Sequence, residues 1–232
     1  MIYRRNSFER GHSQHGWLNS YHTFSFADYY DHNHMGFGPL RVINEDRIAA
    51  GSGFGTHAHR DMEIISYVIS GALAHKDDMG NGSVILPGDI QKMSAGTGVK
   101  HSEFNHAQET THFLQIWIMP NEQNVAPDYQ QKSIPLEDRR GKLALLAGPC
   151  DSGAPVTMHQ DARMYAGMFS AQEKHECILS TERLYYIHLV RGQLTVNGEL
   201  LEAGDALKLL DESTLLIEHG DSADVIVFDM TR

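Results

Sequence analysis

The sequence predicts an all-β protein, folded as a sandwich or a barrel, and three observations support this. Apolar residues occur in short runs rich in β-branched and aromatic side chains, which are typical of strands. Glycine, asparagine, aspartate and proline separate these runs, as they do in turns. No long amphipathic stretch repeats its apolar residues every 3.6 positions, so we expect no long helix.

In the first half of the chain, two runs have the composition of buried strands. Residues 64–69 read Ile-Ile-Ser-Tyr-Val-Ile and are followed by Ser70 and Gly71, and residues 113–119 stop at Pro120. Glycine favours a turn, and proline cannot donate to a β-ladder. We therefore expect a strand to end at each of these places.

In the second half, runs of the same kind occupy residues 184–190, 194–196, 206–210 and 225–228. The first of them ends at Arg191 and Gly192, which predicts a turn there. The second precedes Asn197-Gly198, a favoured two-residue hairpin turn. These runs predict a second set of antiparallel strands.

The two halves show a weak internal repeat. Each has a buried strand, a glycine turn, a hairpin and a Gly-Asp turn into the next strand, at 68–71 and 86–90 in one copy and at 189–192 and 202–206 in the other. Two copies predict two similar β-domains. We place the first at residues 1–132 and the second at 133–232, within a polar connecting stretch that covers 121–140.

The composition excludes several classes of protein. The length of 232 residues fits one or two domains, and 19 basic against 30 acidic residues give a net charge of −11. Without a block of lysine and arginine we expect no direct nucleic-acid binding. No apolar run reaches the ~18 residues that span a bilayer, and none follows Arg4 and Arg5 as in a signal peptide. Cys150 and Cys177 are too few for a disulfide framework, so we expect a soluble cytoplasmic protein.

Fifteen histidines are present, and position separates three of them, together with one glutamate, as candidate metal ligands. His57-Ala58-His59 follows the glycine-rich stretch 51–55, and His101 lies two residues before Glu103. Side chains at i and i+2 of a strand point to one face, so two such pairs would supply three nitrogens and one oxygen. This set suits a divalent transition metal and leaves up to two positions for a substrate or dioxygen.

These residues also resemble two known motifs of the cupins. Gly51-x5-His57-x-His59-x3-Glu63-x7-Gly71 is similar to the first motif, with one extra residue before the last glycine. Gly88-x7-Gly96-x4-His101-x3-Asn105 is similar to the second, with Ser94 where many cupins have proline and two extra residues before the histidine.

More closely, the chain resembles the pirin family, over residues 17–31, 36–42, 57–63 and 94–103. The nearest branch is that of the bacterial quercetinase-like pirins. The resemblance implies a bicupin, which is two antiparallel β-barrel domains of the jelly-roll (cupin) type. It also implies a metal in the N-terminal domain only.

Two glutamates compete for the fourth ligand position. In general cupins the glutamate of the first motif, here Glu63, is a ligand. In pirins it is the glutamate after the second-motif histidine, here Glu103. We expect Glu103 to be both ligand and catalytic base, and Glu63 to be an alternative ligand or to support the ligands from behind.

The second domain does not repeat the ligand set. Counting from its turn glycines, the positions equivalent to the four ligands hold Ile178, Ser180, Ile217 and His219. One histidine does not make a site, so we expect a degenerate cupin without metal. We also expect the other His-x-His pair, His32 and His34, to lie in a solvated loop.

The resemblance implies quercetin 2,3-dioxygenase activity, an O2-dependent ring opening of a flavonol with release of carbon monoxide. It implies one divalent transition metal per chain, with iron as first choice, while the N/O ligand set also accepts Mn, Co, Ni, Cu or Zn. The alternative is a metal- and redox-responsive module of the transcriptional co-regulator type, which binds a protein partner. A cavity that opens onto the metal would favour the enzyme, and a metal closed beneath Phe24 and Phe26 would favour the module.

Overall fold

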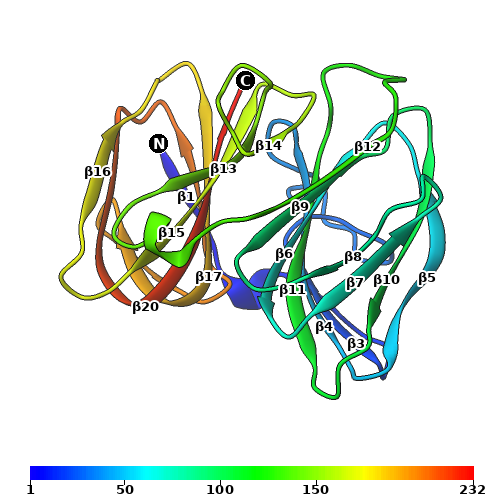
Figure 1. Cartoon of the computed structure of the whole chain (residues 1–232). Helices are drawn as coiled ribbons and strands as arrows, with labels where there is room; N and C mark the ends of the chain where they lie inside the picture. Colours follow the sequence, from blue (N-terminus) through cyan, green and yellow to red (C-terminus); the bar gives the residue numbers. More distant parts are fainter. The chain divides into compact units, whose positions relative to one another are not determined.

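The computed structural model describes all 232 residues of the chain, and almost every regular element is a strand (Figure 1). The exceptions are two single-turn 3-10 helices, η1 (Ser7–Glu9) and η2 (Leu136–Asp138). None of the helices has the length and apolarity that a membrane span requires. The predicted all-β class is confirmed.

The chain forms two units that are interleaved in sequence. One consists of Arg10–Ile134 and Val156–Gln160, and the other of Met1–Glu9, Pro135–Pro155 and Asp161–Arg232. The expected boundary at 132 lies two residues before the end of Arg10–Ile134, and the units also exchange two short segments, Met1–Glu9 and Val156–Gln160. The internal repeat shows where the two halves of the chain lie. It does not show that Met1–Glu9 and Val156–Gln160 each pack with the other half.

The unit around Arg10–Ile134 has two antiparallel sheets, one with the strand order β12-β9-β6-β11-β4-β3-β2 and one with the order β5-β10-β7-β8. The strands are β2 (Gly11–Gln14), β3 (Leu18–His22), β4 (Leu40–Ile48), β5 (Ser52–His59), β6 (Glu63–Ser70), β7 (Leu73–Asp77), β8 (Gly82–Ile85), β9 (Asp89–Ser94), β10 (Val99–Asn105), β11 (Thr111–Ile118) and β12 (Asp128–Ser133), with β14 (Val156–Thr157) beside them in the same unit. Leu18, Ile48 and Phe113 of the larger sheet pack against Leu73 and Ile85 of the smaller one, so the core lies between the sheets.

The predicted strands of this half are found. Residues 64–69 lie in β6, and Gly71 takes a positive φ of 81° in the turn before β7. A Cβ at Gly71 would lie 2.9 Å from the Cα of Thr111, so the turn needs glycine both for its conformation and for its space. Residues 113–119 lie in β11 up to Ile118.

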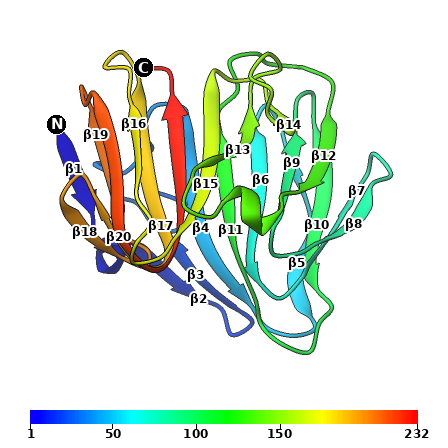
Figure 2. The same cartoon turned by 60° about the vertical axis from the view of Figure 1, so that its left-hand side comes forward.

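The other unit contains β1 (Ile2–Arg5), β13 (Ala144–Gly148), β15 (Ala162–Phe169), β16 (His175–Ile178), β17 (Leu184–Val196), β18 (Glu199–Glu202), β19 (Ala206–Leu210) and β20 (Thr214–Met230). Strand β1 pairs with β19, and β17 pairs with β20 from Leu184–Met230 to Val196–Ile217 (Figure 2). Its core is apolar, with Ile187, Leu207 and Val225 fully buried.

The predicted turn at Arg191 and Gly192 is wrong. Strand β17 runs through both residues, and its register against β20 shifts repeatedly between Leu189 and Thr195. Gly192 has a positive φ of 78°, and a Cβ there would lie 2.2 Å from the carbonyl oxygen of Asp221. The glycine therefore marks a bulge inside one long strand.

Candidate metal centre

Neighbouring strands bring the predicted histidines together. Strand β10 pairs antiparallel with β5, and His101 lies opposite His57 in the ladder. His59 lies on the same strand as His57, two residues further along. Next to this pair β5 has a bulge. The three-residue interval from His57 to Phe54 on β5 lies opposite the two-residue interval from His101 to Glu103 on β10.

The three imidazole rings converge on one point. Their centroids are 4.8 Å apart for His57 and His59, 4.5 Å for His57 and His101, and 4.9 Å for His59 and His101. One nitrogen of each ring lies within 4.8 Å of the other two. This spacing fits a single ion bound between three nitrogens.

The hydrogen bonds show which nitrogens are available. Nδ1 of His57 lies 2.8 Å from the carbonyl oxygen of Gly55. A carbonyl only accepts, so Nδ1 carries the hydrogen and Nε2 keeps its lone pair. Nε2 of His59 and Nε2 of His101 are buried and have no hydrogen-bond partner. Buried polar atoms are almost always paired, so these two nitrogens fit a metal ion as their missing partner.

Burial also keeps two of these rings neutral. Desolvation, aided by the neighbouring His57, lowers the pKa of His59 to about 4. Desolvation, aided by His57 and His59, lowers the pKa of His101 to about 3. A neutral imidazole is the form that binds a metal, so both rings are ready to do so near pH 7.

Glu103 lies on the same face of β10 as His101, but it is not part of the three-histidine group. Its carboxylate accepts hydrogen bonds from Oγ of Ser66 at 3.1 Å and from Nε2 of Gln115 at 3.0 Å. The residue is 1% exposed. Burial raises the pKa of Glu103 to about 7, although both hydrogen bonds act to lower it.

Glu63 lies elsewhere. Its carboxylate accepts a hydrogen bond from Oγ of Ser94 at 2.8 Å and lies 4.0 Å from Nζ of Lys92. In β6 successive side chains alternate between faces, so Glu63 and Ser66 point to opposite sides of the strand. The four-residue spacing between His59 and Glu63 does not fix their relative direction, because a turn separates β5 from β6.

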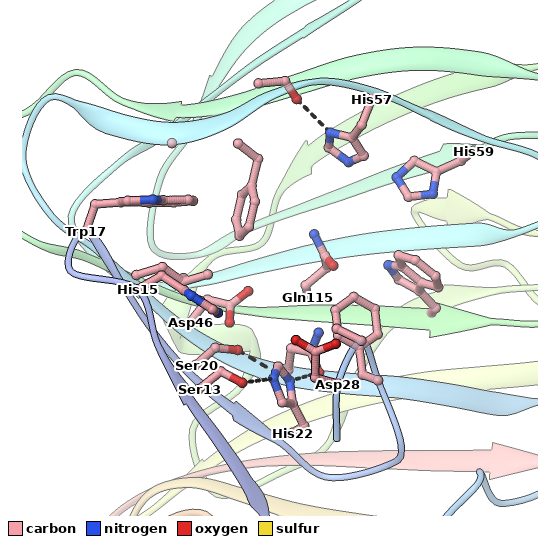
Figure 3. A pocket seen from close by; sticks show the side chains of 18 residues that line it. Ser13, His15, Trp17, Ser20, His22, Asp28, Asp46, His57, His59 and Gln115 are labelled. Carbon is pink, nitrogen blue, oxygen red and sulfur yellow. Dashed lines mark hydrogen bonds between the residues drawn. The ribbon is translucent and has the colours of Figure 1, made fainter. Parts of the chain in front are cut away.

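A cavity of about 440 Å³ opens beside His57 and His59 (Figure 3). Aromatic side chains form much of its wall: Trp17, Phe26, Phe54 and Trp117. The Trp117 ring packs edge-to-face against the His59 ring, with centroids 5.0 Å apart. Phe24 is buried and does not line the cavity. The histidines are thus reached from an aromatic cavity.

The polar part of the cavity wall was not predicted. Gln115 lies between the histidines and a cluster that includes Ser20 and His22 (Figure 3). Asp46 is 2% exposed, its Oδ1 has no hydrogen-bond partner, and burial raises its pKa to about 7 despite a hydrogen bond from Ser20. A signal was present for Gln115 and for Ser66, since each is a lone polar residue within an apolar strand run.

In the second unit the equivalent positions lie apart. Ile178 is 92% exposed and Ile217 is fully buried. His219 has an exposed side chain and a positive φ of 54°. His32 and His34 lie in a loop between β3 and β4, outside the regular strands. Nδ1 of His34 lies 3.0 Å from Oδ2 of Asp31 in this loop.

Two antiparallel units, one with three converging histidines beside a cavity, define the class as a cupin-type protein with a candidate site for a divalent metal. A family model described as Pirin matches residues 4–118, and one described as Quercetinase C-terminal cupin domain matches residues 145–230. The chain belongs to the pirin family, and the predicted bicupin fold is confirmed.

Full-length relatives agree with this assignment. A quercetin 2,3-dioxygenase of Escherichia coli (strain K12) is 44% identical over 231 residues, which cover 99% of each chain. A pirin-like protein of Caulobacter vibrioides is 41% identical over 230 residues, again 99% of each.

Solved structures are also similar. The crystal structure of YhhW from Escherichia coli has a TM-score of 0.94 at 44% identity and covers 99% of this chain and 97% of that one. The bacterial pirin YhhW in complex with nickel(II) has a TM-score of 0.93 at 43% identity and covers 100% and 99%.

Proposed function

We propose that this protein is a metal-dependent dioxygenase that cleaves flavonols such as quercetin, using O2 and releasing carbon monoxide. The observation that carries the proposal is the pair of buried, unpartnered nitrogens of His59 and His101, which converge with His57 beside an aromatic cavity. The names of the quercetin 2,3-dioxygenase relatives point to the substrate class.

In this proposal His57, His59, His101 and Glu103 hold one divalent transition metal. Iron is the first choice from the family, and the nickel(II) complex of a relative shows that a pirin can take another divalent ion. When bound, the metal would supply a Lewis acid for the bound substrate. The donor set of nitrogens and oxygen fits such an ion.

Glu103 is the base that accepts the proton of the flavonol hydroxyl. Its carboxylate lies on the same face of β10 as His101, so a substrate at the metal would have its hydroxyl close to this acceptor. Ser66 and Gln115 hold its carboxylate in place. Burial keeps bulk water away from the acidic proton once it is taken up.

The cavity suits a flat polyphenol. Its volume of about 440 Å³ is within the range of small-molecule sites. Trp17 and Phe54 on one side and Phe26 and Trp117 on the other can pack against aromatic rings. Asp46, among the polar wall residues, offers a hydrogen-bonding group for a substrate hydroxyl.

Oxygen uptake tests this proposal. Protein reconstituted with iron or nickel is mixed with quercetin, and uptake of O2 and release of carbon monoxide are followed together. We expect equal amounts of the two gases, and loss of both in His101→Ala. One bound ion per chain without uptake for any divalent metal would refute the dioxygenase and favour the redox-responsive protein-binding module. A cytoplasmic location, in keeping with two free cysteines, is part of the proposal.

A further inference from the structure

Behind the three histidines lies a fourth one, which neither lines the cavity nor joins the ligand group. His75 lies on β7, opposite Glu103 in the ladder with β10. It is 3% exposed, and its ring centroid is 5.3 Å from that of His101. Its contact with His101 could not be predicted from the sequence, because the two residues are 26 positions apart.

The carboxylate of Asp77 fixes the hydrogen on one nitrogen of His75. Oδ1 of Asp77 accepts hydrogen bonds from the backbone N–H groups of Met79 at 3.0 Å and Asn81 at 2.8 Å. Oδ2 accepts one from Nδ2 of Asn81 at 2.8 Å and lies 3.2 Å from Nε2 of His75. A carboxylate surrounded by donors acts as an acceptor, so Nε2 of His75 carries the hydrogen.

The remaining hydrogens follow from this one. A neutral imidazole has one N–H, so Nδ1 of His75 is an acceptor. That atom lies 3.4 Å from Nδ1 of His101, which therefore carries the hydrogen of the His101 ring. The lone pair of His101 is then on Nε2, the buried nitrogen without a hydrogen-bond partner.

We propose that Asp77, His75 and His101 form a hydrogen-bonded relay that fixes the tautomer and the orientation of His101 toward a divalent metal, which makes His75 a positioning residue. The proposal rests on the metal centre of the proposed function. A ligating imidazole whose other N–H is bonded in this way is oriented and more basic.

Packing holds the relay in place. The ring of Tyr129 stacks on that of His75, with centroids 4.8 Å apart and planes 30° from parallel. The Tyr129 hydroxyl is itself hydrogen-bonded to Ser83 and to Gln131. His57 differs, because its Nδ1 uses the backbone carbonyl of Gly55, which no side-chain substitution removes. Of His57 and His101, only His101 has its tautomer fixed by another side chain, that of His75.

Three substitutions of His75 test the relay. His75→Phe keeps a ring to stack on Tyr129 and removes both nitrogens. His75→Asn places an amide near the position of Nδ1, where it can accept from His101. His75→Gln places its amide near the position of Nε2, where it can reach Asp77 but not His101. The matched control is His112→Phe, since His112 is another strand histidine with a carboxylate partner, Glu45 at 2.9 Å.

Binding of Ni(II) alone gives the first readout. We expect the Kd to rise about 10- to 100-fold in His75→Phe and in His75→Gln. We expect His75→Asn to stay within about threefold of the unsubstituted protein because it retains the acceptor for His101. His112→Phe should bind as the unsubstituted protein does.

The midpoint potential of bound iron gives the second readout. Loss of the relay makes His101 a weaker donor and the ferric ion less stable, so the potential should rise in His75→Phe and stay near its original value in His75→Asn. Where the Phe variant does not fold, the Asn and Gln variants decide by themselves. Equal Kd values for those two would overturn the relay. A failure of the unsubstituted protein to bind Ni(II) would instead refute the metal centre of the proposed function.

Discussion

Ser66 and Glu103 connect the two sheets of the first unit: Oγ of Ser66 on β6 donates to the carboxylate of Glu103 on β10 at 3.1 Å. Strand β6 belongs to the larger sheet and β10 to the smaller one. Both residues are almost fully buried. The hydrogen bond thus links the sheet that carries the histidines to the sheet that faces it.

Ser66→Ala should shift the pH dependence of metal binding. The hydrogen bond lowers the pKa of Glu103 from what burial alone would give, so its loss raises that pKa. A proton must leave Glu103 before the carboxylate can bind metal, so the curve of Ni(II) affinity against pH moves to higher pH. A hydrogen bond to a charged group is worth about 1.5–3 kcal/mol, which is about one to two pH units.

Titration of Ni(II) at a series of pH values measures this shift. Ser94→Ala is the matched control, because Ser94 is also buried and donates to a carboxylate, that of Glu63. Its curve should coincide with that of the unsubstituted protein. Coinciding curves for Ser66→Ala as well would show that Glu103 takes no part in metal binding.

Asp46→Asn should stabilise the metal-free protein above neutral pH. The folded-state pKa of Asp46 is raised from 3.8 to about 7, so between these values the unfolded state ionises while the folded state holds its proton. The free energy of unfolding therefore falls as pH rises through this window. The neutral amide removes this loss, which amounts to about 2–4 kcal/mol. Melting temperatures at about pH 4 and pH 8 should show a gain for the variant only at the higher value.

Asp128→Asn should show the opposite sign. Burial acts to raise the pKa of Asp128, but hydrogen bonds from Lys92 and Gln130 outweigh it and hold that pKa below its usual value. A lowered folded-state pKa stabilises the protein above the unfolded pKa and the effect is lost as pH falls. The Asn variant should therefore be less stable than the unsubstituted protein at high pH. A gain in Asp128→Asn at high pH would contradict the lowered pKa of Asp128, and no gain in Asp46→Asn there would contradict the raised pKa of Asp46.

Metal retention should separate the two His-x-His pairs. His57→Ala removes one of three converging nitrogens, so we expect loss of the bound metal. His34→Ala removes a histidine that is hydrogen-bonded to Asp31 in a loop, so we expect full metal content. Elemental analysis after gel filtration measures both. Equal loss in the two variants would break the assignment of the site.

Phe54→Ala should weaken flavonol binding while leaving the metal in place. Phe54 lines the cavity and packs edge-on against Trp17, with ring centroids 5.2 Å apart. Loss of one aromatic wall contact is worth about 1–1.5 kcal/mol, so KM for quercetin should rise about tenfold. Ni(II) affinity should not change. A tenfold loss of Ni(II) affinity with an unaltered KM would place Phe54 in support of His57 rather than in the substrate wall.

Local patterns predicted the parts of the site that depend on a single strand. His57 and His59 share a face because side chains alternate along a strand, and this holds wherever the strand lies. A turn separates Glu63 from His59. The alternation of side chains is interrupted there, so an even number of residues between the two does not show whether they share a face. The sequence analysis expected His57 with His59, and His101 with Glu103, to lie on strands, and they lie on β5 and β10.

Long-range pairing decided what the sequence could not predict. Gly192 looks like the end of a strand, yet its partner β20, which lies more than twenty residues further on, makes it a bulge. His75 and Asp77 have the i, i+2 spacing of a ligand pair, but the register with β10 turns them toward His101 rather than toward a metal. Asp46 and Gln115 acquire their roles only through the sheets that enclose the cavity.

The pairing of β1 with β19 has a consequence for synthesis on the ribosome. Strand β1 is made about 200 residues before its partner, which begins at Ala206. The N-terminal amino group contacts Leu210, which lies 209 positions away. At 5–20 residues per second this interval lasts about 10–40 s. During that time Ile2 has no partner strand, so β1 stays unpaired until β19 has been made.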